Sequence, residues 1–326
     1  MFFFKKRGDS LRILGLFDGI SCGQYALNEL SLNIKDYYSS EIDKNAMCIT
    51  HSNFPKTHFI GDVTKIDNYK LSEIGHIDII FAGFPCQNIS STGDRTGLAG
   101  SKSSLFFHFY RILEFYKKIN KNILFLVENV GGINQFDLNL INELLGVDSV
   151  ILNSANYSPQ RRIRHYWTNI PLNVGDCQSN NDVLGDVIDV ENDASMFILP
   201  EKLLKVYSML DDGQYWKHLP FDNQERIHID EARSRYPNPG GQTSFWKLSD
   251  KMAKSQTLMA SGMKQKMTRF VLRDYDGLIR YPTPIEFERL QGLPDNYTSS
   301  VSDNKRYYGI GNGWSINTVK KILGGL

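Results

Sequence analysis

Leu11-Arg-Ile-Leu-Gly-Leu-Phe17, followed directly by Asp18-Gly-Ile-Ser-Cys-Gly23, is the stretch that decides the fold. Its first seven residues form a nearly continuous apolar run, which is typical of a strand buried on both faces of a parallel sheet. A helical pattern then covers residues 24–30. Glycines between a first strand and a first helix let a ligand come close to the backbone at the helix N-terminus. The spacing of Gly19 and Gly23 differs from the pyrophosphate fingerprint G-x-G-x-x-G, and such a turn also occurs without any ligand.

Short apolar runs repeat along the first half of the chain. After the first strand we expect strands at 36–40, 58–60, 77–81, 123–127 and 150–157, and a helix at 104–118 whose apolar residues recur at helical spacing. Strands that alternate with helices from residue 11 to about residue 170 predict an α/β fold with a doubly wound, mostly parallel sheet. The pattern weakens after Pro171, so we expect residues 172–279 to form a second, smaller and irregular domain. A proline-opened helix then runs from residue 281 to Gly292.

Carboxylates follow three of the predicted strands. Glu41 lies about twenty residues after the glycine turn, where an acid can bind ribose hydroxyls. Asp62 follows the third strand, and two acids at successive strand ends favour a nucleoside ligand over a bare phosphate. The alternative is that Glu41 and Asp62 cap helices. Glu128 follows the fifth strand and would lie in the crevice at the carboxyl ends of the strands, which suits acid–base or hydrogen-bonding chemistry.

Cys86 follows Gly-Phe-Pro at the end of the fourth strand and begins a loop rich in Ser, Thr and Gly. A strand that delivers one thiol to a flexible loop is how an α/β enzyme presents a nucleophile. Alternatively, Cys86 is an ordinary small, buried residue. The cysteines Cys22, Cys48, Cys86 and Cys177 are scattered, without a C-x-x-C pair. This spacing argues against a zinc site or a disulfide framework and fits a reducing cytoplasm.

Composition and charge narrow the class of protein. The 326 residues are 41% hydrophobic and 22% charged, as in a globular protein. No apolar run approaches the ~18 residues that span a membrane. The net charge of +1 by itself predicts no nucleic-acid partner, but residues 251–273 contain six Lys or Arg residues and no acid. Such a stretch can bind phosphates through side chains and backbone N–H groups, and a solvated surface is the alternative.

Taken in chain order, these segments resemble the cytosine-C5 DNA methyltransferases. The matching segments span nearly the whole chain: Phe17-Asp-Gly-Ile-Ser-Cys-Gly23, Glu41, Gly61-Asp62, Pro85-Cys86-Gln87, Glu128-Asn129-Val130, Gln160-Arg-Arg-Ile-Arg164, Arg280-x-x-Thr-Pro-x-Glu286, Leu290-Gln-Gly-Leu-Pro294 and Gly311-Asn312-Gly-Trp-Ser315. Their residue patterns are similar to those of the de novo branch known from vertebrates. The chain itself is compact, like that of a bacterial or phage enzyme. The resemblance implies the Rossmann-like fold of S-adenosylmethionine-dependent methyltransferases. It also implies a catalytic domain at 1–171, a target-recognition domain at 172–279 and a C-terminal segment, 280–326, that returns to the catalytic domain.

The resemblance also implies a reaction. Carbon 5 of cytosine is a poor nucleophile, and addition of the Cys86 thiolate at carbon 6 would make it enamine-like. Glu128 would hold ring N3 and the exocyclic amine, while Arg164 and Arg162 would bind the base carbonyl and help to keep Cys86 ionised. Carbon 5 would then take the methyl group of S-adenosylmethionine, leaving S-adenosylhomocysteine. The target cytosine must leave duplex DNA to reach such a crevice, so base flipping is implied.

Further residues are assigned by the same resemblance. Glu41 would bind the ribose and Asp62 the adenine amine, and the loop at 87–104 would close over the flipped base. The full cofactor-binding set is Phe17, Gly19, Gly23, Glu41, Asp62, Phe84, Asn312, Trp314 and Ser315. The DNA-binding set is Gln87, Ser90, Lys254, Lys264, Lys266 and Arg269, and no metal is expected.

Other functions fit the sequence less well. An RNA cytosine-C5 methyltransferase of the tRNA-modifying branch would share the chemistry, but its Cys-Phe-Thr segment is absent. A catalytically silent DNA-binding homologue would lack the nucleophile or the cofactor turn. A nicotinamide dehydrogenase would need G-x-G-x-x-G, and an amino-methylating enzyme an Asp/Asn-Pro-Pro-aromatic loop. Asn88-Ile-Ser90 departs from the family's usual small-Phe-Ser. The sequence leaves open the recognition site, a restriction endonuclease counterpart, the choice between monomer and homodimer, and the base that removes the carbon-5 proton.

Overall fold

The structure, a computed structural model, describes residues 10–85, 105–172, 180–189, 194–199, 201, 204, 207, 208, 210–214, 248–260 and 270–326. Its internal contacts divide the chain into two compact units. The first, here called the sheet unit, comprises Met1–Ser154, Ile163–Gln178 and Gly313–Leu326. The second unit comprises Ala155–Arg162 and Ser179–Asn312.

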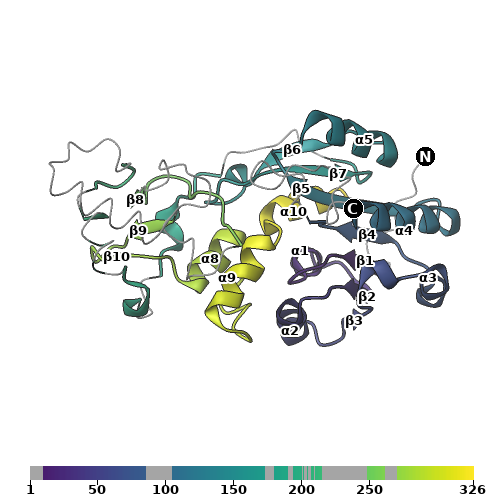
Figure 1. Cartoon of the computed structure of the whole chain (residues 1–326), viewed down its shortest axis with the longest axis horizontal. Coiled ribbons are helices and arrows are strands. Elements are labelled where there is room, and N and C mark those ends of the chain that lie inside the picture. Colours follow the sequence, from purple (N-terminus) through teal and green to yellow (C-terminus); the bar gives the residue numbers. More distant parts are fainter. Residues whose placement is uncertain are drawn as a thin grey trace. The chain divides into compact units, whose positions relative to one another are not determined.

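A seven-stranded sheet forms the centre of the sheet unit (Figure 1). The strands are β1 (Leu11–Leu16), β2 (Ile34–Ser40), β3 (His58–Phe59), β4 (Ile79–Ala82), β5 (Leu124–Val130), β6 (Val150–Asn153) and β7 (Ile163–Thr168), in the order β3-β2-β1-β4-β5-β7-β6. The first five strands are parallel, and β7 runs antiparallel to β5 and β6. The predicted doubly wound, mostly parallel sheet is confirmed. The strand at 163–168 had no clear signal of its own.

Helices cover both faces of this sheet. They are α1 (Cys22–Glu29), α2 (Lys44–Asn53), η1 (Val63–Lys65), α3 (Asn68–Ile74), α4 (Leu105–Ile119), α5 (Gln135–Leu145) and α10 (Ile316–Leu323); η3 (Ser154–Asn156) is a short turn at the unit boundary. On one face, Phe106, Phe109 and Leu113 of α4 pack into a core with Phe125 and Trp167. The apolar residues of α4 recur at helical spacing, so one stripe of the helix is buried. On the other face α1 and α10 pack together.

The second unit contains a small sheet and two longer helices. Its elements are η5 (Leu184–Val187), η6 (Ser195–Phe197), β8 (Leu248–Ser249), β9 (Val271–Arg273), β10 (Ile279–Arg280), α8 (Pro284–Gln291) and α9 (Asp303–Asn312). The strands lie in the order β10-β9-β8. The proline-opened helix begins at Pro284 because Thr283 and Glu286 form a capping box, and it ends at Gly292 with a φ of 82°.

The contacts divide the chain at other positions than the sequence suggested. Residues 280–312 belong to the second unit, and only Gly313–Leu326 belongs to the sheet unit. Ala155–Arg162, expected within the first 171 residues, also belongs to the second unit. Among the described residues, no helix has both the length and the apolar character needed to cross a membrane.

Arg280 is the centre of a fully buried ionic cluster in the second unit. Its Nε donates to Asp274 Oδ2 at 2.9 Å, and its two terminal nitrogens donate to the Glu286 carboxylate at 2.9 and 2.8 Å. Arg280 itself has no exposed surface. Two carboxylates and one guanidinium therefore tie β10 to the first turn of α8 and to the β9–β10 turn.

We expect Arg280→Met to lower the free energy of unfolding by about 3–5 kcal/mol, because it leaves buried carboxylates without their cation. Urea unfolding measures this change. Lys70→Met is the control, since Lys70 pairs with Glu73 and both side chains are about half exposed, so its loss costs less than about 1 kcal/mol. Equal losses in the two variants would contradict the assignment of Arg280 as a buried structural cation.

Candidate active site and cofactor turn

The turn between β1 and α1 has an unusual backbone. Phe17, Gly19 and Ser21 have φ values of 54°, 57° and 55°. These values lie in the left-handed region, which residues other than glycine rarely adopt. A Cβ on Gly23 would lie 2.6 Å from the Phe81 ring, so a larger residue does not fit there. The turn thus brings backbone N–H groups and the start of α1 to the carboxyl end of β1, as expected for a cofactor-binding turn.

Glu41 holds this turn in place. Its Oε2 accepts a hydrogen bond from the Gly19 N–H at 2.8 Å, and its Oε1 accepts from the N–H groups of Ile42 and Asp43 at 2.7 and 2.8 Å. A carboxylate offers about four acceptor sites, so capacity remains for a hydroxyl group. Ile42, which is 73% exposed, follows directly. The sequence interpretation did not single out Ile42, although an exposed apolar residue beside a candidate ribose-binding acid is a detectable signal.

One oxygen of the Asp62 carboxylate caps a short helix, and the other is left for a ligand. Its Oδ1 accepts hydrogen bonds from Thr64 N at 2.9 Å and Thr64 Oγ1 at 2.8 Å and so begins η1. These bonds lower the pKa of the Asp62 carboxyl and keep it ionised. Both bonds use Oδ1, which leaves Oδ2 to accept from an amino group. The cap and the ligand acceptor, posed as alternatives from sequence, are compatible here.

The remaining predicted cofactor residues differ in their surroundings. The Trp314 ring meets Phe81 edge to face at 5.8 Å, and its Nε1 would lie 2.9 Å from a Cβ on Gly83. Ser315 is buried at the start of α10. The Phe84 side chain is buried in the core, 5.3 Å from Phe106. Asn312 is exposed and belongs to the second unit.

Glu128 and Arg164 form the central charged pair of the sheet unit. Arg164 Nε lies 2.9 Å from Glu128 Oε1, and about one tenth of each side chain is exposed. The register explains this pair: Glu128 lies opposite Tyr166 and Val130 opposite Arg164, so the two side chains are diagonal neighbours on one face. Among the described residues Oε1 is buried and accepts no hydrogen bond, so the contact with Arg164 is an ion pair only.

Asn129 connects this pair to the residues that lead toward Cys86. It is buried, and its Nδ2 donates to the Phe84 carbonyl at 3.0 Å, two residues before Cys86. Sequence reasoning quoted Asn129 as part of a motif but gave it no role. Cys86, Gln87, Ser90 and the loop at 87–104 lie outside the described residues.

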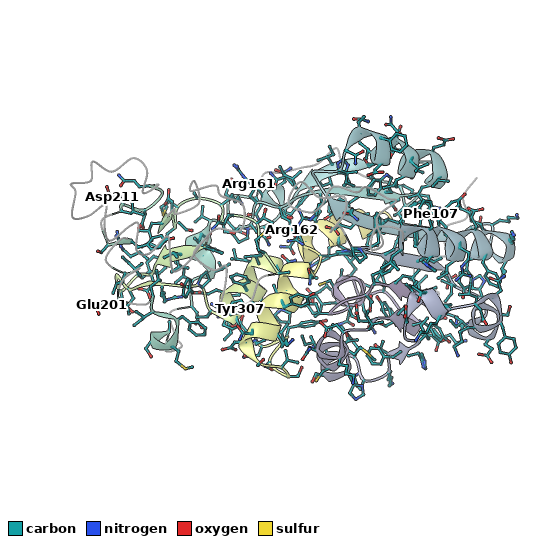
Figure 2. The ribbon with its side chains drawn as sticks, viewed as in Figure 1. Phe107, Arg161, Arg162, Glu201, Asp211 and Tyr307 are labelled. Atoms are coloured by element: carbon teal, nitrogen blue, oxygen red, sulfur yellow. The ribbon has the colours of Figure 1, made fainter. Side chains whose placement is uncertain are left out.

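Arg162, predicted to act with Arg164, lies in the other unit. It is buried, whereas its neighbour Arg161 is exposed, and both are labelled in Figure 2. Its Nη1 and Nη2 donate to the carbonyl oxygens of Leu258 and Gly311 at 3.2 and 3.1 Å. The structure therefore gives Arg162 backbone carbonyls as partners within the second unit.

Residues 254–258 hold the segment that contains Arg162. Arg161 N donates to Ser255 O at 2.9 Å, Ser255 N to Pro159 O at 2.7 Å, and Thr257 Oγ1 to Arg161 O at 2.7 Å. Lys254 Nζ donates to Ser158 O at 3.1 Å and to the two oxygens of Asn180 at 2.7 and 3.1 Å. An ammonium group has three donors, so its capacity is filled internally.

These contacts differ from those of a phosphate-binding lysine, the role that the sequence predicted for Lys254. Burial also lowers the pKa of the Lys254 ammonium, as expected for a cation turned away from water. Lys264, Lys266 and Arg269, the other basic members of the predicted DNA-binding set, lie outside the described residues. In the described parts of the chain, no group of three or more His, Cys, Asp or Glu side chains is arranged to hold a metal ion.

The C-5 cytosine-specific DNA methylase family matches residues 11–326, and the chain belongs to this family. The type II methyltransferase M.HpaII of Haemophilus parainfluenzae is 26% identical over 97% of this chain and 90% of its own length. M.BsuFI of Bacillus subtilis is 29% identical over 99% of this chain and 74% of its own. The protein is an enzyme that methylates carbon 5 of cytosine in DNA.

Solved structures agree on the fold. The Dnmt2 methyltransferase of S. pombe superimposes with a TM-score of 0.69 at 17% identity, covering 96% of this chain and 97% of its own. The Entamoeba histolytica methyltransferase EhMeth gives a TM-score of 0.71 at 16% identity, covering 97% and 98%. At this level of identity the likeness concerns the Rossmann-like methyltransferase fold alone.

We expect Lys254→Met to destabilise the protein by about 1–3 kcal/mol, because two buried carbonyl groups lose a charged donor. The salt dependence of DNA affinity should stay unchanged, because the ammonium is turned inward. Filter binding at several salt concentrations measures this dependence. A slope of log Kd against log salt that falls by about 1 would instead make Lys254 a phosphate contact.

Proposed function

We propose that Cys86, Glu128 and Arg164 form the catalytic centre, with S-adenosylmethionine as the methyl donor. The observation that carries this proposal is the Glu128–Arg164 pair at the ends of β5 and β7. Val127 lies opposite Ala82 of β4, the strand that leads into Pro85-Cys86. Asn129 reinforces this arrangement by binding the Phe84 carbonyl.

The chemistry follows from these roles. The Cys86 thiolate forms a bond to carbon 6 of a flipped cytosine, and the electron pair of the 5,6 double bond becomes available at carbon 5. Glu128 accepts from the exocyclic amine and places a proton at ring N3, where negative charge develops. Arg164 donates to the base carbonyl and keeps Glu128 in position. S-adenosylmethionine supplies an electrophilic methyl group, and loss of the carbon-5 proton then expels the thiolate.

The cofactor would bind at the turn after β1. We assign the ribose hydroxyls to Glu41 and the adenine amine to Asp62 Oδ2, with exposed Ile42 against a face of the adenine ring. The backbone of residues 17–23 would enclose the methionine end. Trp314 and Ser315 would complete that end, and Asn312 remains assigned to it by family resemblance. Phe84 supports the site from the core.

DNA would be bound mainly by residues outside the described parts of the chain. Gln87 and Ser90 would contact the flipped base and its vacated position, and Lys264, Lys266 and Arg269 would contact phosphates. Arg162 is assigned to holding its own segment in place of contacting the base. The type II methyltransferases among the relatives support a role beside a restriction endonuclease.

Bisulfite sequencing tests the nucleophile and the substrate together. We expect plasmid DNA from a host without other cytosine methylases to carry protected cytosines in one short sequence context when the protein is expressed. The Cys86→Ala variant should leave every cytosine converted, because the covalent adduct cannot form. Cys48→Ala, at an exposed cysteine, is the matched control and should keep the protection pattern.

Persistent protection with Cys86→Ala would refute the nucleophile assignment. Complete conversion with the soluble parent protein would count against duplex DNA as the substrate in that host, and RNA would be tried next.

Glu128→Gln should lower kcat by roughly 100-fold to 1,000-fold, as removal of a group that stabilises developing charge does. Transfer of a labelled methyl group to DNA measures this rate. Glu143→Gln, at an exposed position on α5, is the control and should leave kcat unchanged. A Glu128→Gln variant with parental kcat would remove Glu128 from the mechanism.

A further inference from the structure

A second carboxylate, Asp18, lies inside the cofactor turn and has no role in the reaction described above. Its Oδ1 accepts a hydrogen bond from the Tyr37 hydroxyl at 2.6 Å, and its Oδ2 accepts one from Ser21 Oγ at 2.5 Å. Tyr37 and Ser21 are both buried, so these bonds are shielded from water. Asp18 therefore bonds inward, to β2 and to the start of α1, while its backbone remains part of the turn.

A second layer extends this contact to α2. Thr50 Oγ1 lies 3.0 Å from Ser21 Oγ and 3.4 Å from the Gly19 carbonyl oxygen. Asp18 N also donates to Ser40 O at 3.3 Å. Asp18, Ser21, Tyr37 and Thr50, here called the turn clamp, thus join β2 and α2 to the turn.

The backbone of the turn needs such a clamp. Phe17 and Ser21 adopt left-handed conformations that favour glycine, and such conformations persist only where the surroundings impose them. Ser21 precedes α1 at the position where a hydroxyl usually caps the helix, yet it makes no side-chain cap. The Ser21 hydroxyl donates its hydrogen bond to Asp18 instead.

We propose that the turn clamp sets the affinity of the enzyme for S-adenosylmethionine, and that it binds the cofactor with Asp18 ionised. This inference rests on the proposed cofactor site. The ionised carboxylate accepts from both Tyr37 and Ser21, whereas a protonated carboxyl must donate from one oxygen. Protonation of Asp18 therefore forces Ser21 or Tyr37 to turn its hydroxyl from donor to acceptor, which rearranges the hydrogen bonds of the clamp.

The charges around Asp18 give the clamp a pH dependence. Burial raises the pKa of Asp18 to about 6, the nearby Glu41 carboxylate adds to the rise, and the bonds from Ser21 and Tyr37 oppose it. The groups that face Asp18 are Tyr37 and Ser39 from β2, Glu41 from the end of β2, Ser21 from the start of α1 and, through Ser21, Thr50 from α2. The cofactor carries a sulfonium and an ammonium against one carboxylate, so its net positive charge favours ionised Asp18.

The sign of the effect follows from linkage. Below pH 6 the free enzyme holds a proton on Asp18 that cofactor binding must expel, so the Kd for S-adenosylmethionine should rise roughly tenfold from pH 7 to pH 5. Stability changes in the opposite direction. A raised carboxyl pKa contributes stability at low pH that is lost as the pH rises through 6. Weaker binding at pH 5 therefore does not reflect unfolding through Asp18.

Isothermal titration of the full chain with S-adenosylmethionine between pH 5 and pH 8 tests the proposal. The parent should show the tenfold rise in Kd, and Asp18→Asn, which keeps the shape but cannot titrate, should give a flat profile. Tyr37→Phe should weaken binding by about tenfold or more, because a buried carboxylate loses a donor. It should also move the midpoint of the profile to higher pH, which a merely structural defect would not do.

Tyr38→Phe is the matched control. Tyr38 lies on the same strand, and its hydroxyl accepts from Arg12 Nη2 at 2.7 Å, away from the turn. Removal of the Tyr38 hydroxyl should change neither the Kd at pH 7 nor the midpoint of the pH profile.

In steady-state kinetics, Tyr37→Phe should raise KM for the cofactor more than it lowers kcat.

Two outcomes separate a failed clamp from a failed cofactor site. Unchanged affinity in Glu41→Gln would refute the cofactor site itself. Weakened binding in Glu41→Gln, together with a flat parental profile or an unaltered midpoint in Tyr37→Phe, would refute the clamp alone. The parental profile needs no variant, so a misfolded substitution leaves the test intact.

Discussion

The pairing of β5 with strands on both sides is the constraint on which the proposed catalytic centre depends. β4 pairs with β5 in parallel, and β7 pairs with its other edge in the antiparallel sense. A one-residue shift of register would turn Glu128 and Arg164 to opposite faces of the sheet. The side chains that hold this register are apolar and buried, above all Val127 and Trp167. The positions of Glu128 and Arg164 are therefore fixed by apolar packing within the sheet.

Several polar side chains near the strand ends bind the protein's own backbone first and leave part of their capacity for a ligand. Glu41 accepts three backbone N–H groups, Asp62 uses one oxygen for a helix cap, and Asn129 holds a carbonyl group. A side chain fixed in this way loses little conformational freedom when the ligand arrives. Preorganisation of the cofactor turn is thus a property of hydrogen bonds that exist before binding.

The sequence predicted the parts that follow from periodicity and strand ends, and not the parts that depend on distant partners. The strands and α4 were visible because apolar residues recur with a fixed period. Glu128 and Arg164 were singled out because their motifs follow predicted strands. The inward contacts of Lys254 could not be predicted, because a basic residue in a polar stretch looks the same whether it faces phosphate or the carbonyl of Ser158. The Asp18–Tyr37 bond joins residues whose relation appears only when β1 and β2 pair.

The backbone passes between the two units four times. This limits which residues can be exchanged when the second unit is transplanted between relatives. Transplanting 179–312 alone would leave the host's Ser158–Arg162 against a foreign 254–258 segment. The backbone pairing of Arg161 with Ser255 would tolerate such a graft, because it needs no particular side chain. The contacts of Lys254 and Arg162 would not tolerate it, because they depend on these side chains. A chimaera that is to keep the contacts of Arg162 must therefore carry residues 155–162 from the same donor as residues 179–312, so the unit that can be exchanged is discontinuous in sequence.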